Sequence, residues 1–155
     1  MNIMQMTYRE LKDEIAKIIP RNIEYEVDLE AGNIAIITTN MKPFTGQDGL
    51  IGKIARRIKR KIVLRTPIDS MMDMDDAKDV IQDIIPEDAD ITEMYFDACY
   101  REVTIQCRQP GTAIGRRGEN SNAIRDKTGW AVKVERTPPL FSKTVHDIRM
   151  YRQTH

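Results

Sequence analysis

The sequence predicts an α+β protein made of two copies of one unit, each with the element order α-β-β-α-α-β and a three-stranded sheet packed on helices. Its 155 residues suit two small domains of about 70 residues each. Three short sequences recur in the same order along the chain, which defines the two copies. They are Ile18-Ile19-Pro20 with Ile84-Ile85-Pro86, Gly46-Gln47-Asp48-Gly49 with Gly115-Arg116-Arg117-Gly118, and Arg65-Thr66-Pro67 with Arg136-Thr137-Pro138.

The first copy opens with an amphipathic helix that Pro20 ends. Two strands are expected around Ile23–Leu29 and Asn33–Thr38, joined by a turn at residues 30–32. The segment Pro43–Gly49, a helix that follows it and a short strand at Lys61–Arg65 complete the copy. The helices are predicted from apolar residues at helical spacing. These are Tyr8, Leu11, Ile15, Ile18 and Ile19 in the first helix, and Leu50, Ile51, Ile54, Ala55 and Ile58 in the last.

The second copy repeats this order after a linker from Thr66 to Asp73. Its first helix carries Ala77, Val80, Ile81, Ile84 and Ile85 on one face. The strands are expected around residues 91–96, 101–107 and 130–135, with a helical turn near 111–114 and a helix over 119–127. Val103, Ile105 and Cys107 alternate with polar residues, which predicts one buried and one wet face. We therefore place domains at 1–67 and 68–138. Residues 139–155 form a basic helical tail or a linker to a following domain.

Charge is segmented along the chain although its net value is zero. The stretch from Lys53 to Arg65 is basic, Asp69 to Asp97 is almost entirely acidic, and Arg101 to Arg136 is mostly basic. This pattern suggests basic faces on an otherwise acidic body. Ordinary solvated helices are the alternative interpretation. Aromatic residues, at 6%, are too few for a flat stacking platform.

Few residues in the sequence are suited to metal or redox chemistry. Cys99 and Cys107 flank one predicted strand without a CxxC or metal-ligand spacing, so we expect reduced, partly buried thiols in a cytoplasmic protein. His146 and His155 are the only histidines, which predicts no metal site, no cofactor and no enzymatic activity in this chain. No stretch is long enough to span a membrane, and the N-terminus does not resemble a signal peptide.

The loop Gly115-Arg116-Arg117-Gly118 is the strongest functional signal. Its glycines allow positive φ and close approach of a nucleic-acid backbone. The following helix begins at the second glycine, so its free N–H groups face the same place, and the two arginines add full charges. The sequence thus predicts a phosphate clamp for single-stranded RNA, against the alternative of a structural turn. Residues expected to line a groove for about four nucleotides are Ile114, Ala123 and Ile124, with Ala113 and with Val103 or Ile105.

The first copy has the same glycine spacing at Gly46 and Gly49 but a weaker case for binding. Asp48 places an anion where a phosphate would sit, and Thr45 precedes the loop. We expect a packing or partner-docking role for this copy. Its basic helix face is nevertheless expected to attract RNA without specificity. That face consists of Lys53, Arg56, Arg57 and Arg60.

The second copy resembles a KH domain of type II, with Ile114-Gly115-Arg116-Arg117-Gly118 standing where that family has I-G-x-x-G. Nearly the whole chain resembles the N-terminal region of archaeal CPSF-like ribonucleases, through Thr128-Gly129-Trp130, Arg136-Thr137-Pro138-Pro139 and the basic tail. The resemblance implies two tandem type II KH domains, the first often degenerate at its loop. It also implies metallo-β-lactamase and β-CASP domains that cleave RNA with zinc in 3′-end formation and transcription termination.

The zinc motif of that family, His-x-His-x-Asp-His, is absent from this sequence. We therefore expect an excised N-terminal region, with the catalytic domains in cis, rather than a free-standing relative. Two other functions stay open. One is a protein-interaction or dimerisation module in which the KH fold is a scaffold, with a homodimer as the partner. The other is a tandem-KH transcription elongation factor resembling the NusA type.

Overall fold

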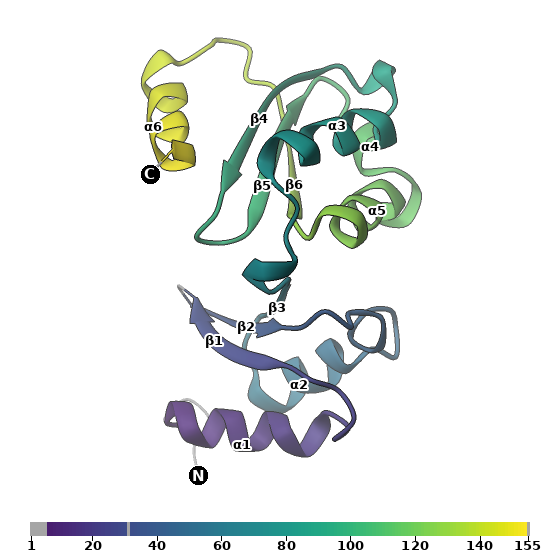
Figure 1. Ribbon diagram of the computed structural model, residues 1–155, viewed down its shortest axis with the longest axis vertical. Helices are drawn as coiled ribbons and strands as arrows, with labels where there is room; N and C mark the ends of the chain where they lie inside the picture. Colours follow the sequence, from purple (N-terminus) through teal and green to yellow (C-terminus); the bar gives the residue numbers. More distant parts are fainter. Residues whose placement is uncertain (1–5, 31, 155) are drawn as a thin grey trace. The chain divides into compact units, whose positions relative to one another are not determined.

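The computed structural model describes residues 6–30 and 32–154 (Figure 1). The chain divides into two compact units, Met1–Pro67 and Ile68–His155. Each unit holds one three-stranded sheet together with helices. The predicted α+β class is confirmed.

The first unit begins with α1 (Tyr8–Ile18), which starts at a capping box. The Thr7 side chain accepts a hydrogen bond from the Glu10 backbone N–H, and the Glu10 carboxylate accepts one from the Thr7 N–H. Strands β1 (Glu26–Glu30) and β2 (Asn33–Ile37) pair antiparallel, and β3 (Ile62–Arg65) pairs parallel to β2. Helix α2 (Leu50–Ile58) connects β2 to β3.

The first unit departs from the predicted element order before its glycine loop. Only a three-residue 3₁₀ turn, η2 (Lys42–Phe44), stands where a helix was expected, so the predicted α-β-β-α-α-β order is wrong there. Pro43 lies at the start of this turn, and Thr45 is already extended. The turn therefore ends before it can form a full α-helical hydrogen-bonding pattern.

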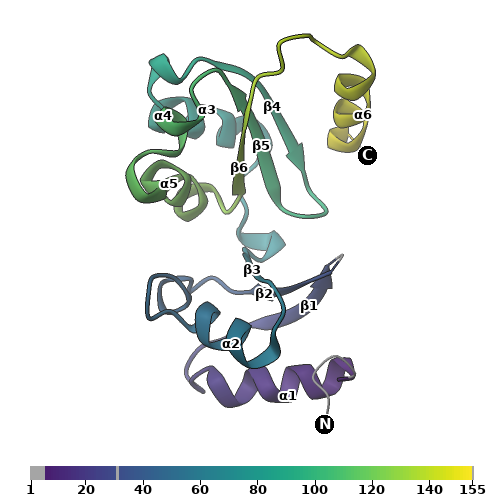
Figure 2. The ribbon, with the colours of Figure 1, turned by 180° about the vertical axis from the view of Figure 1, so that it is seen from behind.

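The second unit has the predicted order (Figure 2). A 3₁₀ turn, η3 (Ile68–Ser70), precedes α3 (Met74–Ile84), which the Asp73 side chain caps. A further turn, η4 (Glu87–Ala89), leads to β4 (Ile91–Asp97) and β5 (Glu102–Cys107), which pair antiparallel. After them come α4 (Pro110–Ile114), η5 (Arg116–Gly118) and α5 (Glu119–Thr128). Strand β6 (Ala131–Arg136) pairs parallel to β5.

Each unit has its own apolar core. In the first, Ile34 and Ile36 of β2 pack with buried residues of α1 and α2. In the second, the ring of Phe96 meets that of Trp130 edge to face, with 4.9 Å between centroids. The indole N–H of Trp130 donates to the Met72 carbonyl oxygen at 2.9 Å, which satisfies this buried donor. The two cores therefore hold two separately packed sheets in place.

The expected basic tail forms a helix, α6 (Lys143–Thr154), which contacts β4 of the second unit. In both views α6 lies on the side of the sheet opposite α3, α4 and α5 (Figures 1 and 2). Helix α6 is thus packed on the second unit. The cysteines differ from expectation in burial: both are free, but Cys99 is exposed and Cys107 is fully buried. Burial raises the pKa of the Cys107 thiol.

Candidate nucleic-acid interface

The loop between α4 and α5 has a backbone that requires glycine. Gly115 has φ of 80° and Gly118 has φ of 75°. A Cβ on Gly115 would also lie 2.8 Å from the Glu119 Cγ and 2.9 Å from the Asn120 Nδ2, so the position excludes a side chain on two grounds. Between them, Arg117 has φ of 56°, an uncommon conformation for a residue with a Cβ. The loop is a strained, closely packed turn.

Both loop arginines project their charge into open surface. Arg116 and Arg117 are exposed, and among the described residues neither forms an ion pair. Side chains of this kind lose little hydration until a ligand arrives, and they can donate up to five hydrogen bonds each to phosphate oxygens. Two full positive charges are therefore available at one turn of the backbone.

The start of α5 adds backbone donors beside these charges. No side chain caps the helix, whose N-cap residue is Gly118. The first N–H groups of a helix lack intrahelical partners, and its dipole is positive there. Asn120 was missed by the sequence analysis: its amide donates to the Thr112 carbonyl oxygen at 3.3 Å and ties α5 to α4. Its position five residues after Gly115 was the available signal.

The structure corrects part of the predicted groove. Val103, Ile105 and Ile124 have no exposed surface, because they form the centre of the second core. They support the loop from beneath and cannot line a surface groove in this arrangement. Ile114 is exposed and Ala123 is half-buried, so these two remain as surface residues. Ala113, like the three core residues, is buried.

Strand β6 supplies apolar surface beside the loop. Val132 and Val134 are only half-buried, although both pack against the second core. Both α4 and α5 contact β6, one of the two edge strands of its sheet. Because Val132 and Val134 alternate with polar residues, the sequence indicates that they share one face of the sheet. It does not indicate that β6 lies at the edge of the sheet, where that face is partly exposed. An apolar edge therefore lies beside the two helices that carry the loop.

The first unit's loop is built differently. Gly46 has φ of 91° and open space around it, whereas Gly49 has ordinary φ and is tightly enclosed. A Cβ on Gly49 would meet the backbone oxygens of Phe44 and Thr45 at 2.4 and 2.6 Å. Asp48 is exposed between them. The glycine spacing in this copy serves backbone packing and presents an anion.

The basic face of α2 is partly neutralised. Arg57 pairs with Glu14 of α1 at 2.9 Å, and the hydrogen bond from Lys17, together with the charge of Arg57, lowers the pKa of Glu14. Lys53, Arg56 and Arg60 are exposed, with no ion pair among the described residues. Three of the four predicted cations of this face are therefore free to meet an anion.

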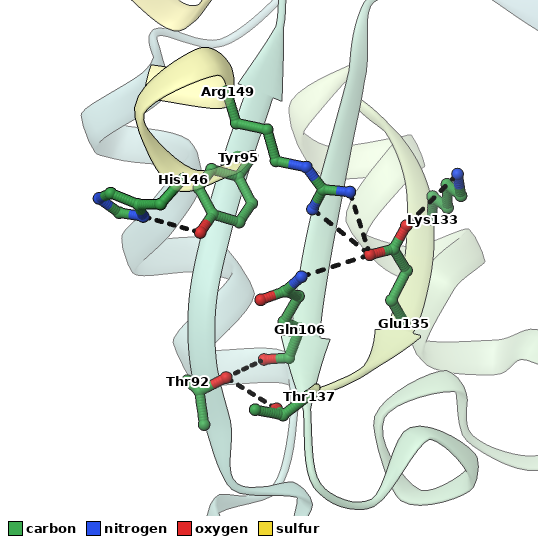
Figure 3. A network of polar contacts seen from close by, with 8 residues as sticks. All are labelled: Thr92, Tyr95, Gln106, Lys133, Glu135, Thr137, His146 and Arg149. Carbon is green, nitrogen blue, oxygen red and sulfur yellow. Dashed lines mark hydrogen bonds and ion pairs between the residues drawn. The ribbon is translucent and has the colours of Figure 1, made fainter. Parts of the chain in front are cut away.

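The opposite face of the second sheet carries a polar network with α6 (Figure 3). Both terminal nitrogens of Arg149 lie 3.4 Å from one Glu135 carboxylate oxygen, which also accepts from the Gln106 amide at 3.4 Å. The Arg149 guanidinium lies 4.9 Å from the centroid of the Tyr95 ring. The Tyr95 hydroxyl is 2.8 Å from Nδ1 of His146. The network attaches α6 to the sheet.

Glu135 is charged within this network. Burial raises the pKa of its carboxyl, but hydrogen bonds from Gln106 and Arg149 and the charges of Arg149 and Lys133 outweigh burial and hold it below its ordinary value. Lys133 lies 3.4 Å from the other carboxylate oxygen. Glu135 thus accepts from both strands and helix, and its charge favours the docked helix.

No group of three or more His, Cys, Asp or Glu side chains in residues 6–30 and 32–154 is placed to hold a metal ion. Within the same residues, no helix has the length and apolar character needed to cross a bilayer.

The second unit combines an α+β fold with a Gly-x-x-Gly loop between two helices, which are the features of KH-type nucleic-acid-binding modules. The first unit is similar in sequence to a known family of such modules. Residues 5–72 match the family model described as "Transcription termination factor FttA, KH domain". This part of the chain is therefore similar to the KH domain of the archaeal transcription termination factor FttA, which confirms the predicted resemblance at the level of the KH region.

Three curated relatives named transcription termination factor FttA illustrate the similarity. The Methanothermobacter thermautotrophicus protein is 37% identical over 141 residues, covering 90% of this chain and 22% of the relative. The Thermococcus kodakarensis protein is 33% identical over 147 residues, covering 94% and 23%. The Methanococcus maripaludis protein is 35% identical over 147 residues, covering 93% and 23%. The chain thus spans less than a quarter of the length of these relatives.

Proposed function

We propose that this chain is a tandem pair of type II KH domains that binds single-stranded RNA through the second. The observation that carries the proposal is the Gly115–Gly118 loop, with two exposed arginines that form no ion pair with any residue the structure describes, beside the uncapped start of α5. Phosphates are held there by charge and by backbone N–H groups. Bases lie beside the loop on Ile114 and Ala123 and along the edge of β6.

The biological role proposed for this binding is recognition of RNA in transcription termination. The relatives are named as termination factors, and residues 5–72 of this chain match a KH-domain model of that factor. In the proposal the RNA-bound module guides metallo-β-lactamase and β-CASP domains, supplied in cis or by a partner, which hold zinc and cut RNA during 3′-end processing. The chain itself is a cytoplasmic binding module that has no nuclease activity and needs no cofactor.

The first unit contributes less to affinity in this proposal. Asp48 repels phosphate, and the loop lacks the helix that precedes it in the second unit. Lys53 and Arg56 lie on α2, whose apolar side packs into the first core, and Arg60 lies two residues past its end. They attract RNA as point charges without reading its sequence. We assign this unit to packing or partner docking, with weak electrostatic support for RNA.

A second candidate function, a protein-interaction module, has one specific observation in its favour. The segment from the end of β6 through α6 exposes large apolar side chains on the described surface of the second unit. They are Leu140, Phe141, Val145 and Ile148. Clustered exposed apolar residues are a feature of interaction sites. In this alternative the RNA loop is idle, so RNA binding distinguishes the two functions.

The test is charge reversal of the loop, Arg116→Asp with Arg117→Asp, measured by fluorescence anisotropy with short U-rich and A-rich RNA. If the loop neutralises about two to four phosphates, log K falls with log salt at a slope of roughly −1.4 to −2.8 in the unaltered protein. The variant should lose nearly all affinity and most of that slope. Asp tolerates left-handed backbone, so stability should change by no more than about 0.5 kcal/mol.

The matched control reverses two charges on the first unit, Lys53→Asp with Arg60→Asp. It changes net charge by the same amount, so a general electrostatic effect would weaken both variants alike. The control should retain most of the affinity, and circular dichroism should show both variants folded. RNA binding by the folded loop variant at the unaltered strength would contradict the proposal and favour the interaction module.

A further inference from the structure

A second cationic side chain, Arg136, lies at the other end of α4 from the glycine loop. Side chains of β6 alternate between the faces of the sheet, and Val132 and Val134 face the helices. Arg136 continues that row at the last position of the strand. Its Nη1 donates to the Arg108 carbonyl oxygen at 3.1 Å, and Arg108 lies two residues before α4 begins. Arg136 therefore marks the start of α4, and Gly115 marks its end.

The separation of the two basic positions suits a short single strand. Helix α4 has five residues, so at about 1.5 Å per residue it is roughly 8 Å long. The half-buried Val132 and Val134 lie on β6, the strand that α4 and α5 contact. A KH groove accommodates about four nucleotides. One strand can therefore reach from the loop to Arg136 with its bases along the apolar edge.

The charge on Arg136 is available. Its side chain is exposed, and among the described residues it has no acidic partner. The bond to the Arg108 carbonyl uses one of five guanidinium donors and fixes the group in place. Arg108 itself pairs with Asp90 at 3.4 Å, but both side chains are more than half exposed, so this pair is weak.

The surroundings also disfavour a path in the opposite direction. Helix α3 contacts α5, and its outer surface carries exposed acids. They are Asp75, Asp76, Asp79 and Asp83. A strand leaving the loop across α3 would meet these charges with no cation at its end. A strand leaving along α4 meets apolar surface and then Arg136, although η4, which contacts α4, also carries the exposed acids Glu87 and Asp88. Like charges repel phosphates and opposite charges attract them, so the cation at the end of α4 favours the second path.

We propose that Arg136 is a second phosphate contact, which holds the RNA strand where it leaves the apolar edge of β6. The inference rests on the proposed RNA-binding function and extends it: the site has two basic ends, joined by α4, and the cation at the end of α4 favours this direction of the strand. The ligand is single-stranded RNA of at least four nucleotides.

The test compares Arg136→Ala with Lys133→Ala, a control that removes one cation from the opposite face of the same strand. An eight-nucleotide U-rich RNA is titrated by fluorescence anisotropy at several salt concentrations. Arg136→Ala should weaken binding roughly fivefold and reduce the salt slope by about 0.7, the value for one phosphate on a single strand. Lys133→Ala should leave both quantities unchanged. Arg136→Lys keeps the charge and should keep most of the slope.

Each outcome decides the proposal. An Arg136→Ala variant that binds like Lys133→Ala would overturn it. So would an Arg136→Lys variant that loses as much as Arg136→Ala, because the effect would then come from the lost bond to Arg108 and a shifted α4. The loop reversal described above is run in parallel. Loss of binding there with no effect at Arg136 refutes the second contact alone, whereas intact binding there refutes the RNA-binding function of the loop.

Discussion

The two units have the same glycine spacing in their loops for different physical reasons. In the first, Gly49 is enclosed by backbone oxygens at 2.4 and 2.6 Å from a would-be Cβ, and its φ is ordinary. In the second, Gly115 and Gly118 both have positive φ, and Gly115 alone is tightly enclosed. A Gly-x-x-Gly pattern therefore identifies a tight turn in both units. The residues between the glycines decide whether the turn can hold a phosphate.

The largest expected effect is on stability, and it distinguishes the lack of space at Gly49 from the positive φ at Gly118. Gly49→Ala should destabilise the first unit by about 3 kcal/mol, since the Cβ meets backbone that cannot move aside cheaply. Gly118→Ala should cost the second unit only about 1–2 kcal/mol, the strain of left-handed backbone, because its nearest neighbour is the Asn122 Nδ2 at 3.8 Å. Trp130, the single tryptophan, reports the second unit by fluorescence, and far-UV circular dichroism reports both. Equal losses for the two variants would argue against this distinction.

A smaller effect concerns α6, which only the second unit has. Glu135 has a lowered pKa when folded, so its contribution to stability is present above the ordinary carboxyl value of 4.5 and is lost as pH falls through the lower folded value. Glu135→Gln should cost about 1 kcal/mol at neutral pH. It should also remove part of the acid sensitivity seen in thermal unfolding followed by Trp130 fluorescence. Parallel pH profiles for the variant and the unaltered protein would contradict the assigned role.

Much of the fold could be predicted because its signals are local. Helices α1 and α3 follow from apolar spacing and the prolines after them, and the strands of the second unit follow from alternation. The fourth element of the first unit could not be predicted, because the glycine loop suggested a helix that Pro43 and Thr45 do not support. Docking of α6 was also not predictable, since it depends on contacts between distant residues.

The candidate site shows a similar division. The loop arginines could be placed from the sequence, because glycine spacing and charge are local properties. The groove could not, because alternation gives the face on which Val103 and Ile105 lie but not whether helices cover that face. The two Arg-Thr-Pro segments also differ in a way that the sequence does not show. The Arg65 side chain donates to the Glu30 carboxylate, and Arg65 lies opposite Ile37, a residue outside the first core. Arg136 comes two residues after Val134, which faces the second core, so it lies on the core-facing side of its sheet.

The most direct test of the account exchanges the loop residues between the units. Arg116→Gln with Arg117→Asp gives the second unit the loop of the first, and Gln47→Arg with Asp48→Arg does the reverse. By anisotropy with short single-stranded RNA, the first exchange should lose nearly all affinity and the salt slope of about two phosphates, roughly 1.4. The second should gain only modestly, because η2 replaces α4 there. Unaltered RNA binding by the folded first exchange would contradict the claim that the Gly115–Gly118 loop is the phosphate clamp.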